Sequence, residues 1–151
     1  MRGEKDSVII FPVTDNQEVV VIHQFRHAAD NIFIELPGGN IDTDESPETA
    51  AGRELLEETG YQAKEIFRFK SAINWFDPST IRSFYIPCLA VGCKQVSKPR
   101  LETTELIEVE TFCIRKWLEI INNGLITDAK TLAITMLAKN YLDKITNQSP
   151  Q

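Results

Sequence analysis

The sequence predicts a single domain of mixed strands and helices over residues 1–151, of the α/β or α+β class. Short apolar runs rich in β-branched residues alternate irregularly with stretches that carry helix start and stop signals. The chain shows no internal repeat, low-complexity tract or linker. Its 151 residues are 42% hydrophobic and 25% charged, and a chain of this size buries about 68–70% of its unfolded surface. It can therefore fold without disulfides or a structural metal.

A β-hairpin is expected at the start of the chain. Residues 8–13 and 18–25 are apolar and β-branched, and residues 14–17 between them are Thr-Asp-Asn-Gln, which favour a turn. Residues 32–36 predict a further short strand, which the Pro-Gly-Gly sequence at residues 37–39 should stop.

Helix signals then replace the strand pattern. Ser46 and Pro47 place a capping hydroxyl before a proline at the first helical position, and Gly60 supplies a C-terminal stop. A helix is therefore expected over about residues 47–59.

The second half of the chain begins with strands and loops. Residues 65–71 are a weaker strand candidate and residues 83–91 a strong one, with a loop at residues 75–79 between them. Another loop is expected at residues 98–100, followed by a strand at residues 106–109.

Two helices and a tail are expected to complete the chain. A helix over residues 114–122 is closed by Gly124. Thr127 can cap a last amphipathic helix that runs from about residue 128 to residue 144. Residues 146–151 are expected to be a frayed tail.

The overall charge restricts the partners. A formal net charge of −6 argues against a duplex nucleic-acid binder, whose affinity rests on Lys and Arg at phosphates. It is compatible with a small anionic substrate, because a metal and a few local arginines can reverse the field of a site. The N-terminus lacks the apolar stretch of a signal peptide, and no run approaches membrane-spanning length. A cytoplasmic protein without a nucleic-acid or membrane partner is expected.

The three cysteines, Cys88, Cys93 and Cys113, are odd in number and widely spaced. The absence of a CxxC pair or a Cys/His cluster favours free thiols in a reducing compartment over zinc or disulfides. Cys88 lies in an apolar run, so it is expected in the core rather than as a nucleophile.

The helix expected at residues 47–59 carries an acidic face. Glu54, Glu57 and Glu58 span an arc of about 100° on it. These carboxylates repel one another and lie near the helix C-terminus, where the macrodipole disfavours negative charge. A bound divalent cation would remove this penalty, and carboxylate oxygens suit Mg²⁺ or Mn²⁺. The alternative interpretation is a solvated acidic face in which Arg53 pairs with Glu57 one turn on.

A longer pattern surrounds the acidic face. Gly39 is followed after five residues by Glu45, and after seven more by Arg-Glu-Leu-Leu-Glu-Glu-Thr-Gly-Tyr at residues 53–61. This pattern resembles the Nudix box, with one departure at Tyr61, where the family usually has an aliphatic residue. The resemblance implies an α+β fold, an α/β/α sandwich with a mixed sheet, in which the box forms a loop, helix and loop beside the substrate cleft.

The resemblance also implies the chemistry. Glu54, Glu57, Glu58 and the carbonyl of Gly38 would be metal ligands, and Glu54 or Glu58 would lie closest to the attacking water. The activity would be hydrolysis of a diphosphate linkage in a nucleoside diphosphate derivative. Metal ions would neutralise the diphosphate, lower the pKa of a bound water and hold it for in-line attack on phosphorus.

Other residues of the box would support this chemistry. Arg53 would complete the catalytic set by orienting a metal-binding carboxylate, and Glu45 would help to hold the loop. Gly39 and Gly60 would be structural, at positions where the backbone geometry excludes a side chain.

Outside the box the chain resembles the ADP-ribose pyrophosphatase branch of the family. The resemblance rests on His-Gln-Phe-Arg-His at residues 23–27, Glu-Leu-Pro-Gly-Gly at residues 35–39, and Gly-Leu-Ile-Thr-Asp-Ala-Lys-Thr at residues 124–131. It implies ADP-ribose or a related nucleotide sugar as substrate, cut to a nucleoside monophosphate and a sugar phosphate, with Arg26 contacting a phosphate. Glu105 falls where the branch keeps a mobile loop that can carry a catalytic glutamate. As a bare carboxylate at a strand edge, Glu105 is equally compatible with plain solvent exposure.

Two departures from the branch bear on the substrate. Residues 74–79 replace its Ser-Pro-Gly-type turn, and Trp75 and Phe76 in this segment either stack on a base or anchor the loop in the core. The branch usually has a longer N-terminal region whose strands are exchanged across a homodimer, so part of the adenine pocket and dimer surface would be missing or rebuilt here.

Three other functions are compatible with the box. They are hydrolysis of another nucleotide sugar or a dinucleoside compound, pyrophosphohydrolysis of an oxidised nucleoside triphosphate, and non-catalytic nucleotide sensing. The sensing alternative is disfavoured because such domains typically lose box carboxylates and this chain keeps Glu54, Glu57 and Glu58.

Overall fold

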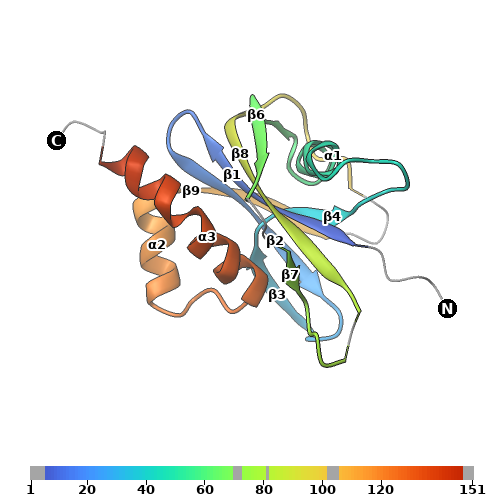
Figure 1. The fold of residues 1–151 in the computed structure, drawn as a ribbon. Coiled ribbons are helices and arrows are strands. Elements are labelled where there is room, and N and C mark those ends of the chain that lie inside the picture. The colour runs from blue at the N-terminus through green and yellow to red at the C-terminus, as the bar shows by residue number, and fades with distance from the viewer. Residues whose placement is uncertain (1–5, 70–72, 81, 102–105, 148–151) are drawn as a thin grey trace.

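A mixed β-sheet with helices on both of its faces forms the frame of the molecule (Figure 1). The computed structural model describes residues 6–69, 73–80, 82–101 and 106–147. The strands are β1 (Ser7–Thr14), β2 (Glu18–Arg26), β3 (Asn31–Glu35), β4 (Gly38–Asn40), β5 (Tyr61–Gln62), β6 (Glu65–Arg68), β7 (Asn74–Trp75), β8 (Phe84–Gln95) and β9 (Ile107–Cys113). The helices are α1 (Pro47–Thr59), α2 (Ile114–Asn122) and α3 (Ala129–Thr146). This architecture confirms the expected α+β fold.

β1 lies at the centre of the sheet. It runs parallel to β8, from Ser7 beside Tyr85 to Val13 beside Val91, and antiparallel to β2 and β4. The main path through the sheet is β3-β2-β1-β8-β5, while β9 pairs with β2, and both β6 and β7 pair with β8. The parallel β1–β8 pair makes the sheet mixed, as the family resemblance implies.

Alternate side chains of β1 support two apolar layers. Val8 and Ile10 pack with Leu55 of α1 on one face. Phe11 packs on the other face with Trp117 of α2 and with side chains of α3. Because successive residues of a strand point to opposite faces, the same strand holds α1 on one side and α2 and α3 on the other (Figure 1).

α1 begins and ends where its capping residues predict. Ser46 Oγ accepts a hydrogen bond from the amide of Thr49 at 3.1 Å, and Pro47 is the first helical residue. Gly60 adopts the left-handed conformation with φ of +75°, and its amide donates to the carbonyl of Leu56 at 2.9 Å. Both helix ends therefore depend on local signals, which the sequence alone displays.

Two predicted loops contain short strands. The sequence predicts a stop at residues 37–39, but Gly38 begins β4, which pairs with β1. The close approach requires a glycine, because a Cβ at Gly38 would collide with the carbonyl oxygen of Val8. The loop predicted from Trp75 onward is wrong at its first residue, since Trp75 pairs with Phe84 in the β7–β8 ladder.

Several strands differ from the prediction in length. β8 continues to Gln95 because β5 pairs with its far end, and β9 continues to Cys113 because β2 pairs with it throughout. β6 ends at Arg68. Residues 70 and 71 of the predicted strand lie outside the described residues.

The N-cap of α3 is Asp128 rather than the predicted Thr127. The Asp128 carboxylate accepts a hydrogen bond from the amide of Thr131 at 2.9 Å. The hydroxyl of Thr131 in turn accepts from the amide of Leu36 at 3.0 Å. This contact ties the start of the helix to the end of β3, and a local sequence pattern does not display it. α3 extends to Thr146, and residues 148–151 of the predicted tail lie outside the described residues.

All three cysteines are free. Cys88 and Cys93 are buried, and burial raises the pKa of both thiols to about 12. Cys88 is therefore a core residue, as predicted, and Cys113 is exposed. In the described part of the chain, no helix is both long and apolar enough to cross a membrane.

Replacing Gly60 by alanine should destabilise the protein more than replacing Gly124. Both glycines have positive φ, +75° and +71°, so alanine adds about 1–2 kcal/mol of left-handed strain at either position. A Cβ at Gly60 would also collide with the carbonyl oxygen of Ser97, whereas a Cβ at Gly124 meets no atom of the described residues within 4 Å. Denaturant unfolding of both variants measures the difference. Equal losses of stability would contradict a role for the Ser97 contact.

Candidate active site

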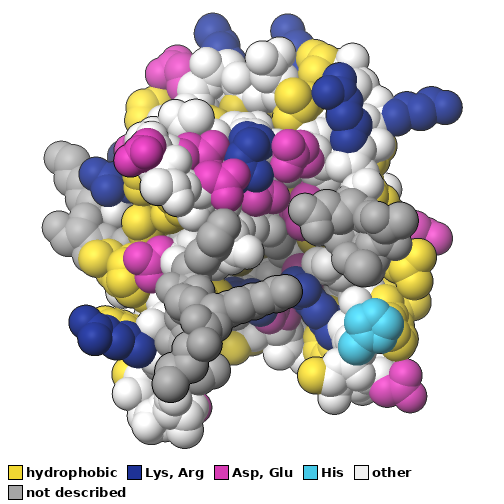
Figure 2. Space-filling view, turned by 90° about the vertical axis from the view of Figure 1, so that its right-hand side faces the viewer, with side chains coloured by type: hydrophobic (Ala, Val, Ile, Leu, Met, Phe, Trp, Pro, Cys, Tyr) yellow, Lys and Arg dark blue, Asp and Glu magenta, His cyan; other side chains and the backbone are white. Residues whose placement is uncertain are grey.

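Three glutamates in the C-terminal half of α1 differ strongly in exposure. The side chain of Glu57 is 47% exposed and that of Glu54 is 14% exposed, while Glu58 is buried. Glu58 Oε2 accepts a hydrogen bond from the amide of Gly38 at 2.9 Å, which joins α1 to β4. Figure 2 shows acidic side chains gathered around a basic one on one face of the molecule.

Arg53 joins Glu54 and Glu57 to the loop that precedes α1. Its Nε and Nη2 donate to the two carboxylate oxygens of Glu45 at 3.0 and 2.9 Å. Its Nη1 donates to Glu54 Oε1 at 2.8 Å and to Glu57 Oε2 at 3.2 Å. Nη2 also donates to the carbonyl of Asn40 at 2.9 Å. The predicted Arg53–Glu57 ion pair is therefore present, as one part of a larger network.

The network changes proton affinities on both sides. The hydrogen bond to Glu45 is the largest cause of the raised pKa of Arg53, and it acts against the effect of burial. In return, the Arg53 guanidinium holds the pKa of the Glu45 carboxyl below its usual range. The repulsion expected along the acidic face is partly offset, because Glu54 and Glu57 share one positive charge.

Gly39 allows a carboxylate to reach the backbone of β4. A Cβ at Gly39 would overlap the carboxylate of Glu54. Gly39 pairs with Val8 of β1, so Glu54 is held against the centre of the sheet. Any side chain at this position would displace Glu54. This explains why the first position of the box pattern in this sequence is a glycine.

The donors in this region suit a hard divalent cation. Glu58 binds the amide of Gly38, the Glu54 carboxylate lies over Gly39, and carboxylate oxygens are ligands that Mg²⁺ takes. Among the residues that the structure describes, no group of three or more His, Cys, Asp or Glu side chains is arranged as a ready metal site. Arg53 holds two of the three carboxylates, so a cation would have to share or replace its contacts. The donor chemistry fits a metal.

A second charged network lies where β2 and β3 meet the start of α3. Arg26 Nε and Nη2 donate to Glu35 Oε1 and Oε2 at 2.8 and 2.6 Å. Lys130 Nζ lies 3.9 Å from Glu35 Oε2 and 2.5 Å from Asp128 Oδ1. The hydrogen bond to Glu35 is the largest cause of the raised pKa of Arg26, and the charge of Glu58 contributes as well. The Arg26 guanidinium therefore lies close enough to α1 for the charge of Glu58 to act on it.

Trp75 and Phe76 have different surroundings. The Trp75 ring contacts Phe84 edge-on at a centroid distance of 5.7 Å, and the Phe76 ring contacts Tyr85 at 5.0 Å. Tyr85 belongs to the core under α2 and α3, so the Phe76 ring packs beside that core, although Phe76 itself remains 40% exposed. Trp75 is 49% exposed. It lines a pocket of about 390 Å³ together with Asp6, Arg82 and Phe84.

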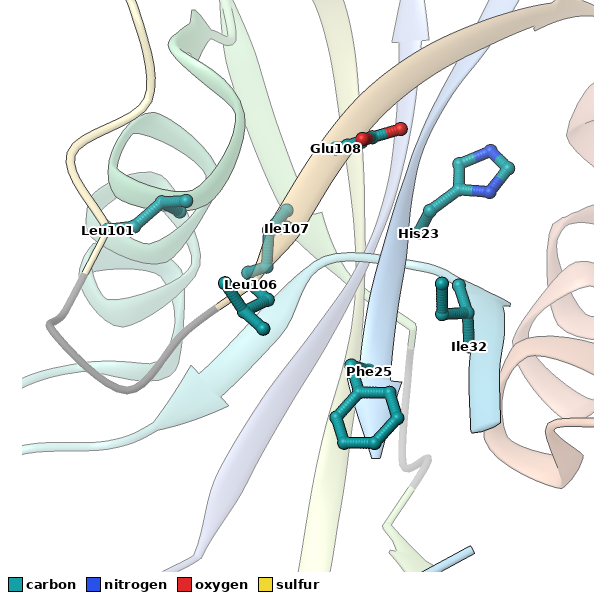
Figure 3. A pocket seen from close by; sticks show the side chains of 7 residues that line it. All are labelled: His23, Phe25, Ile32, Leu101, Leu106, Ile107 and Glu108. Carbon is teal, nitrogen blue, oxygen red and sulfur yellow. The ribbon is translucent and has the colours of Figure 1, made fainter. Parts of the chain in front are cut away.

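A further pocket of about 400 Å³ lies beside β2, β3 and β9 (Figure 3). It is lined by His23, Phe25, Ile32, Leu101, Leu106, Ile107 and Glu108. Phe25 and Arg26 are neighbours in an extended strand and point to opposite sides of it, which separates this pocket from Arg26. Glu105, predicted as a catalytic residue, lies outside the described residues.

The sequence patterns gave no role to several residues of these networks. Glu35, Asp128 and Lys130 stand in motifs that resemble the family, yet their mutual contacts become visible only in the structure. The available signal for Glu35 was a charged residue at the end of an apolar strand, since a buried charge requires a partner. Asp6 and Arg82 carried no comparable signal, because the pairing of β1 and β7 with β8 brings them to Trp75.

Comparison with known proteins agrees with the fold and the box. A NUDIX domain model matches residues 3–128. The chain is 30% identical over 127 residues to an ADP-ribose pyrophosphatase of Bacillus subtilis, a match that covers 83% of this chain and 67% of that protein. It is 30% identical over 148 residues to a GDP-mannose pyrophosphatase of Salmonella typhimurium, covering 93% of this chain and 74% of that one.

A solved structure supports the same fold. It is described as an ADP compounds hydrolase and aligns with a TM-score of 0.81 at 21% identity, covering 93% of this chain and 74% of that one. Hydrolases with a NUDIX domain generally need a divalent metal, which agrees with the donors gathered on α1. The match to the domain model over most of the chain decides the assignment: this protein belongs to the Nudix family and is a pyrophosphohydrolase.

Proposed function

We propose that this protein hydrolyses the diphosphate linkage of ADP-ribose or a related nucleotide sugar, giving a nucleoside monophosphate and a sugar phosphate. The observation that carries the proposal is the similarity over 83% and 93% of the chain to two pyrophosphatases, whose names specify ADP-ribose and GDP-mannose. Both compounds contain a nucleoside diphosphate joined to a sugar. The similarity extends well beyond the box.

In this proposal, Glu54, Glu57, Glu58 and the carbonyl of Gly38 hold Mg²⁺ or Mn²⁺. When bound, the cation supplies neutralisation of the diphosphate charge and a lower pKa for the attacking water. Glu54 or Glu58 accepts the proton of that water as its oxygen bonds to phosphorus and the bond from phosphorus to the bridging oxygen breaks. Glu105 is the other candidate for this proton transfer.

Arg53 and Arg26 have different tasks. Arg53 is a positioning residue, because its guanidinium is fully engaged with Glu45, Glu54 and Glu57. Arg26 is bound on one edge by Glu35 and its side chain remains 45% exposed. We assign Arg26 to a phosphate of the substrate, for which a planar, permanently charged guanidinium is well suited.

The aromatic pocket at Trp75 is our candidate for the base. Trp75 pairs with Phe84, and Phe84 lies two residues before Ile86, which packs in the layer under α1. Side chains two residues apart in a strand share a face. Trp75 therefore lies on the face of the sheet that carries the acidic residues.

The strand register also brings this pocket near Glu54. Asp6, which lines the pocket, lies two residues before Val8, a spacing of about 7 Å along a strand. Val8 pairs with Gly39, over which the Glu54 carboxylate lies. A nucleotide can span this separation, with its base at Trp75 and its phosphates at the carboxylates.

Product analysis tests the proposed reaction. With magnesium, ADP-ribose or GDP-mannose should be converted to a nucleoside monophosphate and a sugar phosphate in equal amounts, as measured by chromatography. The Glu54→Gln variant should fold, because Glu45 still holds Arg53, and should lose about 10²–10⁴-fold in kcat. Cleavage of nucleoside triphosphates with release of pyrophosphate, and none of nucleotide sugars, would contradict the substrate. Nucleotide binding without turnover would favour a sensor.

Magnesium should raise the Tm of the protein. A ligand that binds only the folded state stabilises it by about 2.7 kcal/mol at 100 times its Kd. The Glu57→Gln variant should show a smaller shift, because it lacks the most exposed carboxylate of the cluster. Glu119→Gln, which alters an exposed carboxylate on α2, is the matched control and should keep the full shift. Thermal unfolding with and without millimolar magnesium measures both, and an unchanged wild-type Tm argues against a preformed site.

Trp75→Ala and Phe76→Ala should have separable effects. Loss of base stacking is worth about 1–3 kcal/mol per base, so Trp75→Ala should raise KM with little change in kcat. Phe76→Ala should instead lower the Tm, because the Phe76 ring packs on buried Tyr85. Steady-state kinetics and thermal unfolding on both variants measure these effects. An unchanged KM in Trp75→Ala refutes the assignment of this pocket to the base.

A further inference from the structure

We propose that Glu35 is a positioning residue that holds Arg26 and Lys130 together as a two-cation clamp for the substrate diphosphate. The proposal rests on the proposed function, because it assigns the partner of the same active site. It adds Lys130 as a second phosphate-binding residue and gives Glu35 a defined task. The side chains of Arg26 and Lys130 together form this clamp.

One carboxylate serves both cations. Arg26 binds Glu35 through two parallel hydrogen bonds of 2.8 and 2.6 Å, which fixes the plane of the guanidinium. Oxygen Oε2, which accepts the shorter of these bonds, also lies 3.9 Å from Lys130 Nζ. Both cations are therefore held next to a single oxygen atom of Glu35.

The clamp has a buried negative side and a more exposed positive side. The Glu35 side chain is only 3% exposed, whereas the Arg26 and Lys130 side chains are 45% and 24% exposed. Asp128, the other carboxylate on Lys130, is 10% exposed. The carboxylates thus lie beneath the cations, and an approaching phosphate meets positive charge first.

The start of α3 fixes the second cation. Asp128 binds Lys130 at 2.5 Å and also caps the helix through the amide of Thr131. Burial raises the pKa of Asp128, but the hydrogen bonds from Lys130 and Thr131 outweigh it and hold that pKa below the usual range. Thr131 accepts from the amide of Leu36, the residue after Glu35. The segment Asp-Ala-Lys-Thr therefore connects Lys130 to the strand that carries Glu35.

The clamp lies near the proposed metal ligands. The segment from Glu35 to Gly38 carries the anchor of Arg26 at one end and the amide that binds Glu58 at the other. The Glu58 charge is one of the causes that raise the pKa of Arg26. A diphosphate bound at the carboxylates of α1 through a cation would therefore have the clamp within reach on its other side.

The alternative is that Glu35 only ties α3 to the sheet. In that case Glu35→Gln should lower the Tm and leave KM unchanged. If Glu35 holds the clamp, Glu35→Gln should instead raise KM for the cleaved nucleotide sugar about tenfold and change kcat less than about twofold. The reason is that binding energy is lost equally in the ground state and the transition state. Glu35→Asp keeps the charge and should restore part of the affinity.

The experiment compares Glu35→Gln, Glu35→Asp and Lys130→Gln with Glu110→Gln as the matched control. Glu110 is an exposed carboxylate that pairs with His23 at 2.7 Å outside the clamp, so its variant should keep the wild-type KM. Lys130→Gln, a change at a partly exposed helix start, tests the clamp independently if Glu35→Gln fails to fold. Calorimetric binding of inorganic pyrophosphate with magnesium gives a readout without hydrolysis and should weaken about tenfold in Glu35→Gln and Lys130→Gln.

Unchanged KM and unchanged pyrophosphate affinity in Lys130→Gln overturn the proposal. A lower Tm in Glu35→Gln with unchanged pyrophosphate affinity also overturns it and leaves a structural role. If the wild type cleaves no nucleotide sugar but pyrophosphate binding still depends on Glu35 and Lys130, the proposed function fails and the clamp stands.

Discussion

The guanidinium of Arg53 is the interaction on which the acidic site depends. Glu54 and Glu57 share a helix face with Glu58 and repel one another, and α1 ends nearby with a dipole that disfavours negative charge. A planar cation with donors on several edges can bind Glu45 on one side and two helix carboxylates on the other. A lysine could neutralise charge there but could not hold these groups in fixed directions. Arg53 also ties the loop before α1 to the end of β4 through the Asn40 carbonyl.

That network requires two residues without side chains in β4. Gly38 lets β4 approach β1, and Gly39 leaves the space that the Glu54 carboxylate fills. The Gly38 amide then binds Glu58. Contacts on both sides of β4 therefore require glycine: β1 approaches it within the sheet, and the carboxylates of α1 approach it from above. A charged helix face can approach the sheet this closely because the two residues beneath it have no side chains.

Local signals explain how much of this arrangement the sequence predicts. The bounds of α1 follow from Ser46, Pro47 and Gly60, whose effects act within one turn of the helix. Asp128 rather than Thr127 caps α3 through a local hydrogen bond, but the contact of Thr131 with the amide of Leu36 joins α3 to the end of β3, and no window of sequence contains it. The faces of Trp75 and Phe76 likewise depend on the register of β7 against β8. Box spacing identified the carboxylates of α1, but it did not reveal that Arg53 divides its hydrogen bonds among three of the acids.

The two charged networks use the same residue types and produce opposite fields. Around Arg53 the acids outnumber the cation, since Glu45, Glu54 and Glu57 all bind it, so the surroundings remain negative and favour a metal ion. Around Glu35 the numbers are balanced, but the carboxylate lies beneath the cations, so the accessible side is positive. The sign of each local field thus follows from the number of acidic and basic side chains and from which of them are buried. The net charge of −6 determines the sign of neither field. In the proposed function, the negative network would retain a divalent cation and the positive one would hold the phosphates of the substrate. The segment from Glu35 to Gly39 contacts both networks, so this short stretch of backbone fixes the separation between the Arg26–Lys130 pair and the carboxylates of α1.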